Sequence, residues 1–229
     1  ADTDGAVAVA PLACSYEPRN ALQRALREAL TDSFVFILDG PQGTGKTAGA
    51  MGEGLLAVMR PDTALRKLIV TRPPVSRGNR LGFLPGELGE KMAPWVASMN
   101  DAMEGFSNAT IAKLGQKVEV MSLEHVQGRT VRNAWLIVDE AENLFDRSEI
   151  IDVVTRVGPG GKIFLCGNPA QSKLNIDPNP LAEFIADHGK TPGVVVLTAT
   201  KNDQLRSPGF LKTFLEIEEK IQAKRRRKR

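Results

Sequence analysis

The sequence predicts an α/β fold with a mainly parallel central sheet, and three observations support that prediction. Short apolar runs recur along the 229 residues, at 34–38, 67–70, 117–121, 134–138, 162–166 and 194–198. Helix-length segments separate several of these runs, as in chains that build parallel sheets. The first run leads into a glycine-rich segment, 40–47, and another run ends in two acidic residues. Because ligands bind at the carboxyl ends of parallel strands, both features are expected at one edge of the sheet.

The composition is that of an ordinary globular protein, with 42% hydrophobic and 25% charged residues. This length favours one domain. We expect a flexible arm at 1–18, a single domain at 19–223 with a helical insertion at about 85–116, and a basic tail at 224–229. The whole chain has 30 basic and 27 acidic residues, a net charge of +3. The tail holds six of the basic residues, so the folded body without it is mildly acidic.

The chain has the composition of a cytoplasmic protein that does not enter a membrane. Cys14 and Cys166 lack the spacing of a disulfide framework or a metal site, which favours a reducing compartment. The apolar run 6–13 is short and follows acidic residues where a signal peptide carries basic ones. No run approaches the roughly 20 apolar residues that span a bilayer.

The first helix is predicted from Asn20, a good N-cap residue, to about Ala29. Gln23 lies on it and is either a solvated or a functional side chain. A second helix is predicted at 48–59, and it contains Gly49, Gly52 and Gly54. Glycines are unfavourable inside helices, so they indicate either close packing on the sheet or a frayed helix.

The segment between the first strand and the second helix has the pattern of a phosphate-binding loop, G-x-x-x-x-G-K-T. It comprises Gly40, Pro41, Gln42, Gly43, Thr44, Gly45, Lys46 and Thr47. Glycines allow several backbone N–H groups to approach one polyphosphate, and the helix that follows adds its dipole. Lys46 is then expected to reach the β- and γ-phosphates, and Thr47 to supply a hydroxyl ligand to Mg²⁺.

Two further segments carry basic and polar residues. The second strand runs into Thr71 and Arg72, and the loop that follows contains Arg77, Arg80 and Phe83. Such a loop either binds a phosphate backbone and stacks on a base, or is a solvated loop. Arg129 and Thr130 follow the run at 117–121.

The most apolar run, 134–138, ends in Asp139 and Glu140. Paired with a phosphate loop, Asp139 is expected to hold Mg²⁺ through its water shell, and Glu140 to orient or deprotonate the attacking water. The run 162–166 leads to Asn168 and Gln171, where a polar side chain can sense the γ-phosphate. Arg206 follows the last strand, and an amphipathic helix is predicted at 209–223.

These motifs describe a P-loop NTPase with a water-activating glutamate, and the sequence resembles the PhoH-like family, relatives of superfamily 1 helicases with one RecA-like domain. The resemblance covers about 19–215. It rests on GPQGTGKT at 40–47, TRPPV at 71–75, LGFLPGEL at 81–88, QGRT at 127–130, VDEAEN at 138–143, GNPAQ at 167–171 and DQLRSP at 203–208.

The resemblance implies a three-layer RecA-like fold, ATP and Mg²⁺ as ligands, and a role for each matching residue. It implies that Gln23 recognises adenine, that Lys46 and Thr47 bind phosphate and Mg²⁺, and that Asp139 and Glu140 are the metal and water residues. It further implies that Gln171 senses the γ-phosphate and that Arg206 completes a site. The residues that it places toward nucleic acid are Thr71, Arg72, Arg129 and Thr130. Family members usually carry Asp where Asn168 stands and Gln where Glu142 stands, so roles that need those charges do not transfer.

Superfamily 1 helicases enclose ATP between two RecA-like domains, whereas this sequence has one phosphate loop. We therefore predict a homo-oligomer, a hexameric ring as the resemblance suggests, in which Arg206 acts on a neighbouring subunit's nucleotide.

Three functions are compatible with the sequence. The leading one is ATP hydrolysis coupled to remodelling of, or translocation along, single-stranded RNA or DNA. A small-molecule kinase shares the phosphate loop, although Glu140 favours water as the acceptor. A nucleic-acid-binding protein that uses ATP as a switch, without motor activity, is the third. The tail does not decide between them, because runs of like charge bind many polyanions.

Overall fold

The computed structural model describes residues 16–73, apart from 32 and 61, residues 117–206, apart from 175, and residues 213, 214, 216, 217 and 220. A number of the sequence-based predictions lie outside these residues. They are Arg77, Arg80, the insertion at 85–116, residues 1–15 of the arm, the tail at 224–229 and most of the helix at 209–223.

The centre of the molecule is a sheet of six parallel strands in the order β3-β2-β4-β5-β1-β6. Each strand forms at an apolar run from which a strand was predicted. The strands are β1 Val35–Asp39, β2 Lys67–Thr71, β3 Val118–Val120, β4 Ala134–Asp139, β5 Lys162–Gly167 and β6 Val194–Thr198. In the register of the central strands, Thr71 pairs with Val138, and Asp139 pairs with Cys166. The polar residues that follow β2, β4 and β5 therefore emerge at one edge.

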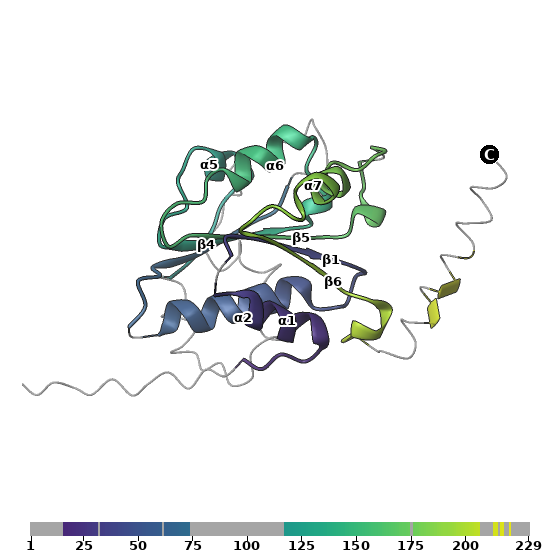
Figure 1. Cartoon of the computed structure of the whole chain (residues 1–229), viewed down its shortest axis with the longest axis horizontal. Coiled ribbons are helices and arrows are strands. Elements are labelled where there is room, and N and C mark those ends of the chain that lie inside the picture. The colour runs from purple at the N-terminus through teal and green to yellow at the C-terminus, as the bar shows by residue number, and fades with distance from the viewer. Residues whose placement is uncertain are drawn as a thin grey trace, which may run out of the picture.

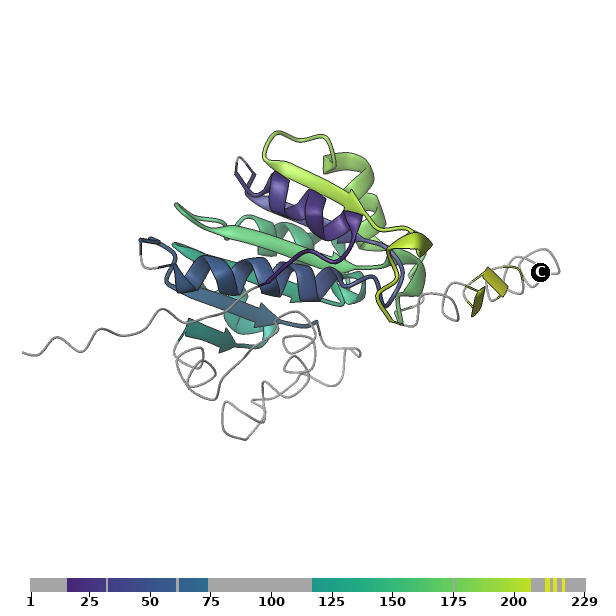
Figure 2. The same cartoon turned by 90° about the horizontal axis from the view of Figure 1, so that it is seen from below.

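Helices cover both faces of the sheet. Helices α1 Ala21–Ala29 and α2 Lys46–Met59 lie on one face, and α5 Leu123–Gln127, α6 Arg147–Val154 and α7 Pro180–His188 lie on the other (Figure 1). Figure 2 shows α1 and α2 side by side across the strands. Short 3-10 helices, η1 Ala141–Asn143, η2 Pro169–Gln171 and η3 Lys201–Asp203, follow β4, β5 and β6. This is the three-layer RecA-like P-loop NTPase arrangement that the sequence predicted.

The alternation of side chains along the strands builds two apolar cores. In β1, Phe36 and Leu38 pack with α1 and α2, whereas Val35 and Ile37 pack with the helices of the opposite face. Because these four side chains are at most 6% exposed, β1 is buried on both faces, as a central parallel strand should be. The carboxyl end of β1, which carries the phosphate loop, is thereby fixed in position.

The glycines of α2 allow close packing rather than fraying. A Cβ at Gly52 would lie 2.4 Å from the ring of Tyr16, and one at Gly54 would lie 2.6 Å from the side chain of Leu68. Tyr16 falls within the segment from which a flexible arm was predicted, yet it is 2% exposed. The missing glycine side chains let Tyr16 and α1 lie directly on α2, beside the phosphate loop.

Candidate active site

The phosphate loop adopts backbone conformations that glycine provides. Gly40, Gly43 and Gly45 have φ values of 143°, 80° and 73°. A Cβ at Gly45 would also lie 2.6 Å from Leu205 and 2.7 Å from Gln23, so neighbouring chain segments approach the loop closely. Gly45 is the N-cap residue of α2, and Lys46 and Thr47 are the first residues of that helix. The loop therefore ends at a helix N-terminus, where an anion is favoured.

Residues outside the loop bind four of its consecutive carbonyl groups. The donors are Gln204 Nε2 to Gln42 O at 2.8 Å, Leu205 N to Gly43 O at 2.9 Å, Asn20 Nδ2 to Thr44 O at 2.8 Å, and Gln23 Nε2 to Gly45 O at 3.0 Å. Carbonyl oxygens repel phosphate, so holding them in these bonds preorganises the loop for an anion. Two segments distant in sequence, 20–23 and 204–205, supply the donors.

Lys46 is held where a phosphate is expected. Its Nζ donates hydrogen bonds to Gly40 O at 2.6 Å and to Pro41 O at 2.9 Å. Burial lowers the pKa of the Lys46 ammonium, despite the opposing influence of nearby acidic groups. A polyphosphate supplies more negative charge than these two carbonyls, so its binding favours the charged ammonium.

Thr47 and Asp139 fit the protein ligands of a magnesium ion. Thr47 Oγ1 donates to Asp139 Oδ1 at 2.6 Å, which brings the hydroxyl of α2 to the carboxylate at the end of β4. Oxygen ligands of this kind are the ones Mg²⁺ prefers, and Mg²⁺ typically takes few protein ligands besides phosphates and water. Within the residues that the structure describes, no cluster of three His, Cys, Asp or Glu residues could hold a metal.

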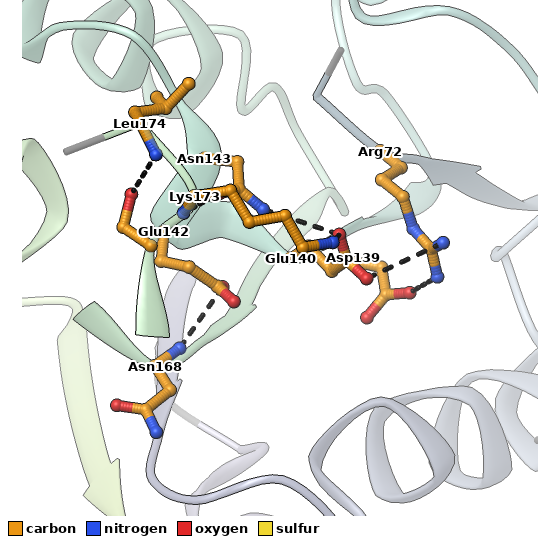
Figure 3. Close-up of polar contacts among 9 residues, drawn as sticks. Arg72, Asp139, Glu140, Glu142, Asn143, Asn168, Lys173 and Leu174 are labelled. Carbon is orange, nitrogen blue, oxygen red and sulfur yellow. Dashed lines mark hydrogen bonds and ion pairs between the residues drawn. The ribbon is translucent and has the colours of Figure 1, made fainter. Parts of the chain in front are cut away.

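Glu140 is held by polar contacts at the end of β4. Glu140 Oε2 lies 3.3 Å from Lys173 Nζ and 3.4 Å from Asn143 Nδ2, and its Oε1 lies 3.7 Å from Arg72 Nη1 (Figure 3). Its backbone has a φ of 52°, a left-handed conformation that is uncommon outside glycine. Such a conformation costs free energy and persists only where the surrounding structure holds it, and residues of this kind cluster at functional sites.

The two departures from the family pattern contact each other. Glu142 is 7% exposed, and its Oε2 accepts a hydrogen bond from Asn168 N at 3.2 Å (Figure 3). Burial raises the pKa of the Glu142 carboxyl. Gln171 ends the short helix η2, which Asn168 caps, and its buried Oε1 has no hydrogen-bond partner among the described residues. An unpaired acceptor at this position can receive a hydrogen bond from a ligand or its water shell.

One cavity of about 510 Å³ collects the predicted catalytic residues. Its lining includes Gln23, Gly43, Gly45, Lys46, Thr47, Arg72, Asp139, Glu140, Glu142, Asn168, Gln171 and Arg206. Gln23 is 2% exposed, so it is not a solvated helix residue. Arg206 lines the cavity of its own chain, because Gln204 and Leu205 attach the segment before it to the phosphate loop.

The described residues predicted to face nucleic acid do not form one surface. Thr71 is fully buried at the end of β2, and Arg72 contacts the active-site carboxylates. Arg129 and Thr130 instead line a separate hollow of about 140 Å³, where Arg129 pairs with Glu119 at 3.3 Å. A nucleic acid that contacted both places would have to extend over the region between them.

Three residues that organise the site were barely indicated by the sequence. Asn20 was predicted as a helix cap, but its amide group also joins the phosphate loop to Asp203 O at 2.7 Å. Gln204 and Lys173 each lie in or beside a recognised motif, DQLRSP and GNPAQ respectively, and that proximity was the available signal. Their partners are distant in sequence, so the fold was needed to identify their contacts.

A glycine-rich loop that opens a helix, with carboxylates at the end of a nearby parallel strand, defines the site of a P-loop NTPase. The profile of the PhoH-like protein family matches residues 15–217. The chain belongs to the PhoH-like family, as its motifs suggested.

Two curated relatives illustrate the similarity. The chain is 39% identical over 160 residues to protein PhoH2 of Bacillus subtilis, an alignment that covers 66% of this chain and 35% of the relative. It is 34% identical over 160 residues to a PhoH-like protein of Mycobacterium leprae, covering 69% of this chain and 45% of the relative. The chain thus spans less than half the length of these relatives.

Solved structures show a more distant likeness. The large terminase of a thermophilic bacteriophage matches with a TM-score of 0.48 and 14% identity, covering 83% of this chain and 48% of the terminase chain. The Hef helicase domain of Pyrococcus furiosus matches with a TM-score of 0.44 and 13% identity, covering 79% of this chain and 38% of the helicase chain. Among the described residues, no helix is long and apolar enough to cross a membrane.

Proposed function

We propose that this chain binds ATP with Mg²⁺ and hydrolyses it. The observation that carries the proposal is the meeting, in one cavity, of Lys46 and Thr47 with Asp139, Glu140 and Gln171. Phosphoryl transfer to water requires a positioned phosphate, a metal site and a carboxylate that activates water, and these residue types supply all three.

Each residue has a defined task in this reaction. Lys46 and the loop amides bind the β- and γ-phosphates, and Thr47 and Asp139 hold the metal ion, which neutralises phosphate charge when bound. Glu140 accepts the proton of the attacking water, and Lys173 keeps its carboxylate in position. Gln171 contacts the γ-phosphate or the attacking water.

Arg206 and Gln23 act at other parts of the nucleotide. The sequence-based prediction assigned Arg206 to a neighbouring subunit's nucleotide. Because Arg206 lines the cavity of its own chain, we propose instead that it stabilises charge on the nucleotide held by its own phosphate loop. Gln23 lines the same cavity and is proposed to hydrogen-bond adenine after releasing its present bonds to Gly45 O and Arg19 N.

We further propose that hydrolysis is coupled to binding and remodelling of single-stranded RNA or DNA, or to translocation along it, by a ring-like homo-oligomer, a hexamer as the family resemblance suggests. Arg72, the first basic residue of the segment predicted to contact nucleic acid, contacts the active-site carboxylates, which supports such coupling.

The decisive experiment measures phosphate release from ATP with and without single-stranded RNA or DNA. Glu140→Gln is expected to abolish release, whereas the exposed Glu183→Gln, which removes the same charge from α7, should retain the parent rate. Stimulation by nucleic acid supports the motor. Release that no nucleic acid alters, together with phosphate transfer to a small acceptor, identifies a kinase instead. Hydrolysis by Glu140→Gln at the parent rate overturns the role given to that carboxylate.

Two further measurements test the assembly and the tail. Light scattering with ATP should detect an oligomer, and a monomer that hydrolyses ATP at the full rate contradicts the ring. Deleting residues 224–229 should weaken nucleic-acid binding and flatten its salt dependence, since fewer phosphates are neutralised, without removing basal hydrolysis.

A further inference from the structure

Arg72 joins the two carboxylates that the proposed reaction needs. Its Nη2 hydrogen-bonds Asp139 Oδ2, and its Nη1 lies 3.7 Å from Glu140 Oε1 (Figure 3). The Arg72 side chain is 34% exposed, and that of Asp139 is 13% exposed, so the pair is partly shielded from water. The guanidinium therefore contacts both carboxylates, and Arg72 lines the nucleotide cavity with them.

This position competes with a metal ion for Asp139. One carboxylate oxygen of Asp139 already accepts from Thr47 and the other accepts from Arg72. Mg²⁺ demands near-octahedral coordination and keeps several waters, which need the same space and the same lone pairs. Two positive groups at one carboxylate also repel each other in a partly buried site. Full loading of the metal site therefore requires Arg72 to leave Asp139.

The place of Arg72 in the chain identifies what can draw it away. It follows β2 directly, and the basic segment predicted to contact a nucleic-acid backbone begins with it. A phosphate diester is a strong guanidinium acceptor and can replace a carboxylate in that role. Because β2 and β4 are hydrogen-bonded neighbours, with Thr71 opposite Val138, Arg72 leaves the sheet beside Asp139, so one side chain can serve either the carboxylate or a phosphate.

We propose that Arg72 is an interlock that holds the metal and water carboxylates until a nucleic-acid phosphate binds it. This inference rests on the proposed function and specifies how nucleic acid would regulate it. Arg72 is thus a positioning residue that acts through Asp139 and Glu140. Linkage makes the effect reciprocal: whatever factor nucleic acid adds to metal affinity, the metal adds to nucleic-acid affinity.

The test measures Mn²⁺ binding, as a stand-in for Mg²⁺, by electron paramagnetic resonance in the presence of a non-hydrolysable ATP analogue. Arg72→Gln is expected to bind Mn²⁺ at least about fivefold more tightly than the parent, the lower end of typical coupling between sites. The matched control is Arg147→Gln, which breaks an exposed ion pair with Asp187 that does not line the cavity. It should bind Mn²⁺ like the parent.

The second arm adds single-stranded poly(U) RNA or poly(dT) DNA. In the parent, the polymer should tighten Mn²⁺ binding, and in Arg72→Gln that effect should disappear while basal hydrolysis rises. Unchanged or weaker Mn²⁺ binding by Arg72→Gln overturns the interlock, even if the parent hydrolyses ATP and responds to nucleic acid. The converse result is a parent that releases no phosphate from ATP while Arg72→Gln binds Mn²⁺ more tightly than the parent does. That pair of results upholds the interlock and overturns the proposed function.

Discussion

Replacing Gln23 tests whether this residue supports the phosphate loop, recognises adenine, or does both. Its side chain donates to Gly45 O at 3.0 Å and accepts from Arg19 N at 2.8 Å, in surroundings that leave it 2% exposed. Gln23→Leu keeps the approximate volume and removes both hydrogen bonds. Each bond contributes about 0.5–1.5 kcal/mol, so the free energy of unfolding should fall by about 1–3 kcal/mol. For a chain of this size, each kcal/mol lowers the Tm by about 2–4 °C.

The matched control is Gln204→Leu. Gln204 is 4% exposed and donates one hydrogen bond to the same loop, at Gln42 O, but it does not line the cavity. It loses one bond where Gln23→Leu loses two, so its Tm should fall by about half as much. Calorimetry of both variants makes the comparison, and a Tm for Gln23→Leu equal to that of the parent refutes the hydrogen-bond argument.

Nucleotide titrations of the same variants separate the two roles of Gln23. Loss of support for the loop weakens ATP and GTP equally, because both carry the same triphosphate. Loss of hydrogen bonds to adenine weakens ATP alone, by about tenfold if about 1.4 kcal/mol is lost. We expect Gln23→Leu to reduce the preference for ATP and Gln204→Leu to leave it unchanged. An equal loss of ATP and GTP affinity in Gln23→Leu refutes the adenine role.

Three other predictions follow from packing and from shifted pKa values. Gly52→Ala should lower the free energy of unfolding measured by urea titration, because its Cβ would lie 2.4 Å from the Tyr16 ring. Overpacking costs about 1–3 kcal/mol, against a helix-propensity gain of about 1 kcal/mol. The control is Gly128→Ala, whose Cβ would meet nothing nearer than 3.8 Å, and it should not be destabilised in the same way. Burial raises the pKa of Glu142 in the folded chain, so the folded state binds this proton more tightly than the unfolded state does. Stability should therefore fall as the pH rises from the ordinary glutamate pKa through the raised one, and Glu142→Gln should lessen this fall between acidic and neutral pH. Identical pH profiles of stability for the parent and the variant contradict the burial argument. Since the pKa of Lys46 is lowered, ATP affinity should decline with rising pH before an ordinary lysine titrates, and an affinity that stays constant through the alkaline range counts against it.

The strands were predicted well from the sequence because their signal is local. Each parallel strand is an apolar run, and turn residues or polar motifs mark where it ends. The first helix was predicted with its cap, and Asn20 does accept from Gln23 N at 3.0 Å. Helix α5 is five residues long, too short for a periodic pattern, and no helix was predicted there. Helix α7 was also missed, although Asn179 and Pro180 form a typical helix start.

The arrangement of the site was harder to predict because it depends on strand order. The sequence placed Arg72 at the end of a strand but did not show that this strand lies next to β4. That adjacency brings Arg72 to Asp139, where the sequence had assigned it to nucleic acid. The burial of Gln23 likewise depends on the packing of α1 against α2, which the glycines of α2 allow.

The hydrogen bonds to the phosphate loop explain why the nucleotide site depends on both flanks of the domain. Asn20 donates to Thr44 O within the loop and to Asp203 O after β6, so one amide joins three segments that are far apart in sequence. Gln204 lies directly after Asp203 and holds the loop from the other side. A nucleotide that fixes the loop therefore also restrains the segment leading to Arg206, and through it the position of that arginine.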